Sequence, residues 1–372
     1  MKTRETRLQV YGIVLGLLAL LLLTASAAQE DVLRKSFTFT DKGTLIIEAD
    51  RGSIDVLPST DGQISVAVFR KAKASSASKE RQILDDHHVE FTQHGNKLRI
   101  VGKSPRDMSN WSSWFGRSQL EVRFEVHLPV NFDADLKTAG GNIKVQELTG
   151  KLELATSGGD LNLGSVNIVK GRTSGGSIHL GKSAGDVELS TSGGNIRAGK
   201  VQGNVSANTS GGHIEISFVG GESELRTSGG DIRVDQAGGS IRAGTTGGNV
   251  RVGSVTGKAD LHTTGGNIEI AKAGGSIQAG TSGGNVRVGL TSALTDASEV
   301  RTTGGDIRVE VAGDTPFDLD ARTTGGDVKA EVPVQVTEPN KGSVLRGQVN
   351  GGGKLLKLRT TGGNIRVQKS AG

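Results

Sequence analysis

Short alternations of apolar and polar residues repeat along most of this chain, separated by corners rich in glycine. In the stretch 227–234, Thr-Ser-Gly-Gly-Asp-Ile-Arg-Val, Ile232 and Val234 point to one face of a strand and Arg233 to the other. The apolar pair is therefore expected to face inward. Equivalent pairs are Ile196/Ala198, Ile214/Ile216, Val250/Val252, Ile268/Ile270, Val286/Val288 and Ile307/Val309.

The glycines set the length of the repeat. From Gly176 to Gly284 a glycine stands at every ninth position, and every second one closes a Thr-Ser/Thr-Gly-Gly motif. Self-similarity at a short fixed period indicates a solenoid, so the repeating unit is about 18 residues: one coil with two short strands. We expect glycine at these corners because it readily adopts the positive φ of a tight turn.

A threonine begins each corner motif. Stacked coils place equivalent residues about 4.7–4.9 Å apart, so these threonines predict a column along the solenoid axis. Because they share a face with the inward apolar pairs, we expect their hydroxyls to satisfy backbone groups of the turns. The column comprises Thr138, Thr156, Thr173, Thr191, Thr209, Thr227, Thr245, Thr263, Thr281, Thr302, Thr323 and Thr360.

The chain before the repeats has a different texture. Residues 29–135 are predicted to form a β-rich cap with one short helix at about 75–88, and residues 136–368 the glycine-rich solenoid. Within the solenoid, residues 333–353 are expected to protrude as an inserted loop. The strands expected in the cap lie at 44–49, 63–68, 97–101 and 120–126.

The first 28 residues are typical of a signal peptide. Lys2, Arg4 and Arg7 precede an apolar run at 10–23, and small residues suited to cleavage follow near Ala28. We therefore expect export to the periplasm, the outer surface or the medium. An uncleaved segment would instead anchor the chain, and this would be its only predicted contact with a membrane.

Composition agrees with a thin, repetitive fold. Only 34% of the residues are hydrophobic and 3% aromatic, which is too little for a wide core but enough for stacked thin coils. The chain has no cysteine, so it forms neither disulfides nor thiolate metal sites. Its net charge is +5, and removal of residues 1–28 (three cations and one anion) leaves +3. This mild charge gives no reason to expect nucleic acid as a partner.

One outward ladder is rich in arginine. Guanidinium groups at strand spacing match the carboxylates or phosphates of an anionic polymer, such as an acidic polysaccharide or lipopolysaccharide. The alternative is a solvated face on which Glu215 and Glu269 relieve repulsion between the cations. The candidate binding residues are Arg197, Arg233, Arg251, Arg287 and Arg308.

Trp111 and Trp114 are candidates for contact with a ligand, since exposed tryptophans stack on sugar rings or sit at membrane interfaces. The alternative is that they cover the open end of the first coil.

The sequence favours no catalysis and no cofactor. It lacks a G-x-S-x-G elbow, an H-E-x-x-H motif and a phosphate-binding loop. Calcium-binding rolls also repeat every nine residues, with the pattern G-G-x-G-x-D, but here Ile and Val or Ala stand in place of the later Gly and Asp. A polysaccharide lyase on a parallel β-helix remains the enzymatic alternative, and it would need an acid/base cluster that interrupts the repeat.

Residues 126–145, Val-His-Leu-Pro-Val-Asn-Phe-Asp-Ala-Asp-Leu-Lys-Thr-Ala-Gly-Gly-Asn-Ile-Lys-Val, together with the later Thr-Ser-Gly-Gly-Asp-Ile repeats, resemble the DUF4097 adhesin family of secreted bacterial β-solenoids. The resemblance covers about residues 40–368 and implies a right-handed, single-stranded parallel β-helix without catalytic residues. We therefore expect an all-β, non-enzymatic, adhesin-like protein that binds or supports structures at the cell envelope. A periplasmic sensing or scaffold module for another envelope protein is the alternative.

Overall fold

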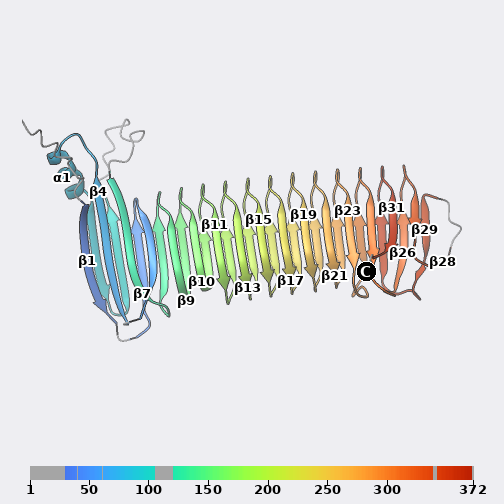
Figure 1. Cartoon of the computed structure of the whole chain (residues 1–372), viewed down its shortest axis with the longest axis horizontal. Coiled ribbons are helices and arrows are strands. Elements are labelled where there is room, and N and C mark those ends of the chain that lie inside the picture. Colours follow the sequence, from blue (N-terminus) through green and yellow to red (C-terminus); the bar gives the residue numbers. More distant parts are fainter. Residues whose placement is uncertain (1–29, 40, 61, 105–119, 338–341, 371–372) are drawn as a thin grey trace, which may run out of the picture.

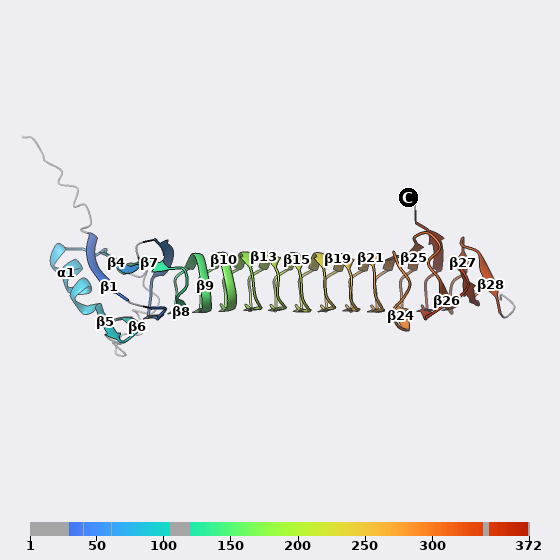
Figure 2. The ribbon, with the colours of Figure 1, turned by 90° about the horizontal axis from the view of Figure 1, so that it is seen from below.

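The chain forms one elongated solenoid. The computed structural model describes residues 30–39, 41–60, 62–104, 120–337 and 342–370. Their strands join in one continuous sheet that winds into a row of coils, with the helix α1 (Ala77–Asp86) at the N-terminal end (Figures 1 and 2). The predicted all-β solenoid with one short helix is confirmed. The signal segment, Trp111 and Trp114 lie outside the described residues.

Each regular coil consists of a long strand, a turn, a short strand and a Thr-x-Gly-Gly corner. The long strand β17 (Ile232–Ala237) pairs in parallel with β19, Ile232 opposite Val250, which is one repeat of 18 residues along the chain. The other long strands are β11 (Ile178–Ser183), β13 (Ile196–Val201), β15 (Ile214–Val219), β19 (Val250–Val255), β21 (Ile268–Ala273), β23 (Val286–Leu290), β25 (Ile307–Val311), β27 (Val328–Ala330) and β31 (Ile365–Lys369).

The short strands stack in the same way to form the second side of the solenoid. They are β12 (Val187–Ser190), β14 (Val205–Asn208), β16 (Ser223–Arg226), β18 (Ile241–Gly244), β20 (Ala259–His262), β22 (Ile277–Gly280), β24 (Ser298–Arg301), β26 (Phe317–Arg322) and β30 (Leu355–Arg359). Two earlier strands, β9 (Ile143–Thr156) and β10 (Leu161–Arg172), are long enough to contribute to both sides.

The inward positions are those that the alternation predicted. Ile232 and Val234 are fully buried, and so is Leu225 on the facing short strand. The threonine column is buried as well. Thr227 donates its hydroxyl to the carbonyl of Gly212 in the preceding coil (2.8 Å), and the amide of Gly230 donates to the same hydroxyl (3.3 Å). Each threonine thus joins two adjacent corners.

The repeat glycines serve a different purpose from the one expected. None of the corner glycines adopts a positive φ; among the described residues such angles occur only outside the regular array, for example at Gly52 and Gly313. Instead the coils approach too closely for a side chain. A Cβ added to Gly230 would lie 2.0 Å from the carbonyl oxygen of Gly212, whereas one added to Gly229 would meet nothing nearer than 3.5 Å. Stacking therefore requires glycine only at the second position of the pair.

At the N-terminal end, the order of the coils in space differs from their order in the sequence. The coil formed by β2 (Thr44–Ala49) and β3 (Ser53–Ser59) lies between two others. On one side are β6 (Lys97–Lys103) and β7 (Leu120–Pro129), and on the other β8 (Asp133–Thr138) and β9. The predicted boundary after residue 135 therefore falls inside β8, and residues of the predicted cap already form solenoid coils.

Antiparallel strands cover this end of the solenoid. The strand β4 (Gln63–Ala72) pairs with β7, and β1 (Glu30–Thr38) pairs with β4. The edge of β6 is covered by β5 (His88–His94). Such cover protects the edges of the parallel coils and leaves β1 and β5, each paired on one side among the described strands, as the outermost strands.

The C-terminal end repeats this arrangement. The last coil in the sequence, β30 and β31, is inserted between the coil of β24 and β25 and the coil of β26 and β27. The outermost short strand, β26, is covered by the antiparallel strand β29 (Val344–Val349), which in turn pairs with β28 (Val334–Val336). Residues 333–353, expected as a protruding loop, are therefore largely a hairpin that extends the sheet.

We predict that the two glycines of one corner differ in their tolerance of a methyl group. Gly230→Ala should lower the free energy of unfolding by about 2–4 kcal/mol, because a backbone carbonyl blocks the added carbon. Gly229→Ala is the matched control and should change it by less than about 0.5 kcal/mol. Urea unfolding of both variants measures the difference, and equal losses would contradict the close-approach explanation.

His87, which follows α1, is an unusual buried residue of the N-terminal end. Its side chain is 1% exposed, and within the described part of the chain neither ring nitrogen has a hydrogen-bond partner. Burial lowers its pKa from 6.5 to about 4; Arg70 and Arg51 act in the same direction, and Asp50 opposes them. The folded state therefore holds this imidazole neutral.

Acid should for this reason destabilise the N-terminal end. The folded pKa lies below the unfolded one, so the contribution of His87 is complete above about pH 6.5 and is lost as the pH falls toward 4, by up to about 3 kcal/mol. The urea midpoint measured across this range should fall in the wild type and in His94→Gln, whose exposed histidine is the control. In His87→Leu most of that fall should disappear, and a wild-type slope in this variant would refute the assignment.

Candidate functional site

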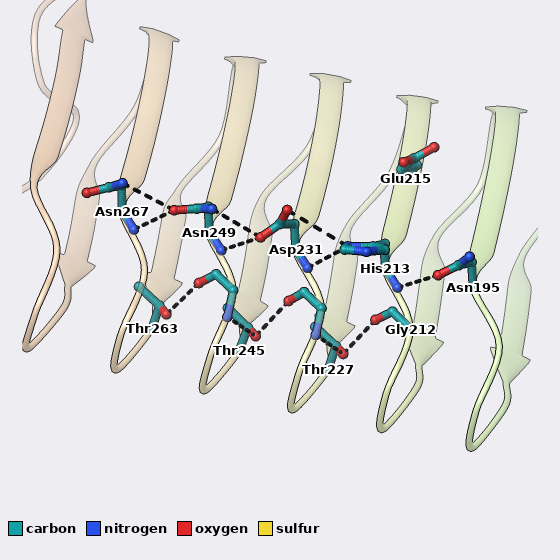
Figure 3. A network of polar contacts seen from close by, with 12 residues as sticks. Asn195, Gly212, His213, Glu215, Thr227, Asp231, Thr245, Asn249, Thr263 and Asn267 are labelled. Carbon is teal, nitrogen blue, oxygen red and sulfur yellow. Dashed lines mark hydrogen bonds and ion pairs between the residues drawn. The ribbon is translucent and has the colours of Figure 1, made fainter.

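The corner between each short strand and the next long strand carries a ladder of polar side chains. The Oδ1 atom of Asn249 accepts the backbone amide of Asn267 in the next coil (2.9 Å), and the Oδ1 of Asp231 accepts that of Asn249 (2.7 Å) (Figure 3). His213 takes the same place with its Nδ1, which accepts the amide of Asp231 (2.9 Å). These oxygen and nitrogen atoms are occupied in stacking the coils, which explains the Asn and Asp there without any metal.

The predicted arginine ladder exists as a physical row on the long strands. Parallel register places Arg233 beside Arg251, and Arg287 beside Arg308. We call this row the arginine ladder; in spatial order from the N-terminal side it comprises Lys144, Asn162, His179, Arg197, Glu215, Arg233, Arg251, Glu269, Arg287, Arg308, Arg366 and Lys329.

Most of the predicted binding arginines are already paired with carboxylates. The ion pairs are Arg197–Glu215 (2.8 Å), Arg233–Asp235 (3.0 Å), Arg251–Glu269 (2.7 Å) and Arg287–Glu310 (2.6 Å). All four are exposed, so each contributes little stability. Their main effect is to neutralise the middle of the ladder, which makes it a weaker attractor of anions than the sequence suggested.

The C-terminal end of the arginine ladder keeps its positive charge. Coil insertion brings Arg366 between Arg308 and Lys329, an order that the sequence alone does not give. Among the described residues Arg308 and Lys329 have no carboxylate partner, and Arg366 approaches Glu331 only to 3.7 Å. These three cations line a shallow groove of about 230 Å³ with Asp306, Asp327 and Asn364.

A second basic row lies on the short strands and was missed by the sequence reasoning. We call it the pre-corner ladder because each member immediately precedes a corner threonine. In spatial order it comprises Ala155, Arg172, Ser190, Asn208, Arg226, Gly244, His262, Gly280, Arg301, Arg359 and Arg322. None of these residues is acidic. Reading the residue before each corner threonine along the sequence would have revealed the pattern.

A row of mixed charge runs along the same strands, two residues before each member of the pre-corner ladder. We call it the mixed ladder. It supplies partners to part of the pre-corner ladder: Arg172 pairs with Glu188 (2.9 Å), and Arg226 pairs with Glu224. Hydrogen bonds from Lys170 and Arg172 hold the pKa of Glu188 below its usual value. Its members are Glu153, Lys170, Glu188, Ser206, Glu224, Arg242, Asp260, Gln278, Glu299, Lys357 and Asp320.

The remaining candidates give no second site. Trp111 and Trp114 belong to the segment between β6 and β7 that lies outside the described residues. Within the described ranges, no three His, Asp or Glu side chains are grouped so as to hold a metal ion. None of the described helical residues forms a stretch of the length and apolarity needed to span a bilayer.

Comparison with known proteins matches the chain to a family. The sequence model of a family described as Toastrack DUF4097 matches residues 44–255 and, overlapping with it, residues 205–368. Curated proteins give no match. Solved structures with some likeness include a presumed cell adhesion protein from Clostridium sporogenes (8% identity, 92% of this chain and 100% of that one, TM-score 0.21). Another is a presumed adhesin from Parabacteroides merdae (12% identity, 92% and 97%, TM-score 0.25). Likeness at this level carries no functional weight.

Proposed function

Because the chain belongs to the Toastrack DUF4097 family, we propose that it is an exported, non-enzymatic β-solenoid that binds anionic polymers of the cell envelope or surface, in the manner of an adhesin. Its presumed ligands are acidic polysaccharides or the phosphate-bearing part of lipopolysaccharide. The signal-like segment at 1–28 supports export.

The observation that supports binding over catalysis is the regularity of the outward faces. From β11 to β25, each coil presents the same outward positions in register with its neighbours. Catalysis by a β-helix lyase would need an acid/base group with a shifted pKa in a cleft. Outside the N-terminal end, the described titratable groups with resolved shifts are Glu188 and Asp320, both carboxyls held in their charged form by ion pairs.

Within the arginine ladder, the C-terminal end is best suited to bind an anion. Arg308, Arg366 and Lys329 are adjacent in the sheet, while the arginines from Arg197 to Arg287 are already neutralised. An incoming carboxylate or phosphate would have to displace a protein carboxylate in the middle of the ladder but not at this end. The groove there is also lined by Asp306 and Asn364, whose Oδ1 atoms accept backbone amides of adjacent coils.

We predict that the unpaired cations matter more for binding than the paired ones. The wild-type protein, expressed from the full-length gene, should bind immobilised polygalacturonate or lipopolysaccharide and not neutral dextran. The double variant Arg308→Gln/Lys329→Gln should weaken this binding about tenfold, a change of about 1.4 kcal/mol. Biolayer interferometry at physiological ionic strength gives the dissociation constants.

The matched control is Arg197→Gln/Arg251→Gln, which removes the same charge from arginines that already have carboxylate partners. It should change affinity by less than about threefold. Absence of binding by the wild type to every anionic polymer would reject the proposed function. Release of ultraviolet-absorbing unsaturated sugars from polygalacturonate would show that the protein is a lyase.

A further inference from the structure

Three arginines of the pre-corner ladder stand in adjacent coils near the C-terminal end. Arg301 on β24 is in register with Arg359 on β30, and Arg359 is in register with Arg322 on β26. They come from three separate stretches of sequence, and only the insertion of the last coil aligns them. Adjacent coils place their backbone positions about 4.8 Å apart, a spacing at which like charges repel unless they are neutralised.

Arg359 is held by the protein, and its two neighbours are not. One of its amino groups donates to the backbone carbonyls of Asp320 (2.7 Å) and Leu358 (2.9 Å), and the other donates to the Asp320 carboxylate. Burial raises the pKa of Asp320, but hydrogen bonds from Arg359 and Arg346 outweigh burial and hold this pKa below its usual value. The carboxylate therefore stays charged. Asp320 is therefore already engaged with Arg359 and Arg346.

Arg301 and Arg322 are exposed, and within the described part of the chain neither has a carboxylate or hydrogen-bond partner for its side chain. Elsewhere in the same ladder, Arg172 and Arg226 each have one. The backbone positions of these two arginines flank that of Arg359 and so lie two coil steps apart, about 9–10 Å. Because no protein group engages these two guanidinium groups, each can form bidentate hydrogen bonds with a carboxylate of a ligand.

A glycine makes room beside the first of these arginines. A Cβ added to Gly280 would lie 3.2 Å from the Nε of Arg301 and 3.2 Å from the Nδ1 of His262. Both side chains thus lean over Gly280 from the coils on either side. Gly280 is buried beneath them, so these two nitrogen-bearing side chains continue the basic surface from Arg301 toward the middle of the solenoid.

The residues alongside fit a polysaccharide better than a nucleic acid. Gln278 and Glu299 in the mixed ladder can accept hydrogen bonds from sugar hydroxyls, but a carboxylate so close would repel a densely charged backbone. Nucleic acid carries a phosphate about every 3.4 Å along each strand, far denser than two free cations whose backbone positions are about 9–10 Å apart. A polysaccharide with one carboxylate per sugar, such as polygalacturonate, can present the carboxylates of alternate sugars to two cations at this spacing. The ladder also contains no Phe, Tyr or Trp on which bases could stack.

From this arrangement we propose a polysaccharide-binding site on the short strands β22, β24, β30 and β26. Arg301 and Arg322 bind two carboxylates of one acidic polysaccharide chain, which runs along the solenoid axis. Arg359, which is held by Asp320, lies between them. The inference rests on the proposed function, since it names a ligand class for it, and it adds a second binding surface, on the short strands and separate from the arginine ladder.

The test compares two pairs of arginines in the same ladder. Polygalacturonate binding is measured for the wild type, for Arg301→Gln/Arg322→Gln, and for the control Arg172→Gln/Arg226→Gln, which removes equal charge from ion-paired positions. We expect the first pair to weaken binding about tenfold or more and the control less than about threefold. Arg301→Lys/Arg322→Lys retains the charge without the fork and should lie between them. Thermal unfolding confirms that each variant is folded.

Each other outcome would overturn the inference. Equal losses in the two pairs would mean that only general attraction is at work. An unchanged affinity in Arg301→Gln/Arg322→Gln, with a loss in Arg308→Gln/Lys329→Gln, would refute this site and leave the proposed function intact. Tighter binding of duplex DNA than of polygalacturonate at equal ionic strength would refute the ligand class, and monomeric galacturonate as tight as the polymer would refute the two-point contact. No binding to any acidic polymer would reject both proposals.

Discussion

The fold depends on one contact, the approach of each Thr-x-Gly-Gly corner to the carbonyl of the corner before it. In one corner the Thr227 hydroxyl accepts a hydrogen bond from the amide of Gly230 and donates one to the carbonyl of Gly212 in the preceding coil. The second glycine must lack a side chain because that carbonyl occupies the space. The contact recurs at each regular corner and also at Thr302 and Thr360, where the spacing along the chain differs, so it keeps outward residues in register whatever the length of the coil. Function can then vary only through which side chains occupy the ladders.

Because equivalent residues of successive coils lie side by side, a charged position in the repeat becomes a row of charges along the solenoid. Equivalent positions about 4.8 Å apart favour alternating signs, and Arg251–Glu269 shows the usual result, an exposed pair with little left to attract a ligand. In the arginine and pre-corner ladders, the described arginines without a carboxylate partner occur together where the last coil is inserted. They are Arg308 on one side, next to Arg366 and Lys329, and Arg301 and Arg322 on the other. Both proposals follow from this concentration at one end.

The sequence predicts whatever is local to one repeat. Alternation placed Ile232 and Val234 inside, and the motif placed Thr227 at a buried corner, because both depend on residues a few positions apart. It did not predict that Arg366 lies between Arg308 and Lys329, since coil order is decided by pairing between distant strands. The role assigned to the glycines was wrong for the same reason: a pair of glycines suggests a turn, while the real restriction comes from the neighbouring coil. The members of the pre-corner ladder each stand one position before a corner threonine in the sequence, but the adjacency of Arg301, Arg359 and Arg322 again depends on coil order.

Insertion of a coil at each end also explains why binding should occur along the sides and not at the tips. A terminal coil with one free chain end would fray, and its edge would pair with other chains. Here the strand β31 is held on both edges by β25 and β27, and β3 likewise by β7 and β9. The outermost coils are covered in turn, β7 by β4 and β26 by β29. With the ends occupied by this cover, the lateral ladders are the surfaces that the repeat leaves open to a partner, and their rigidity means that a polymer must match their spacing.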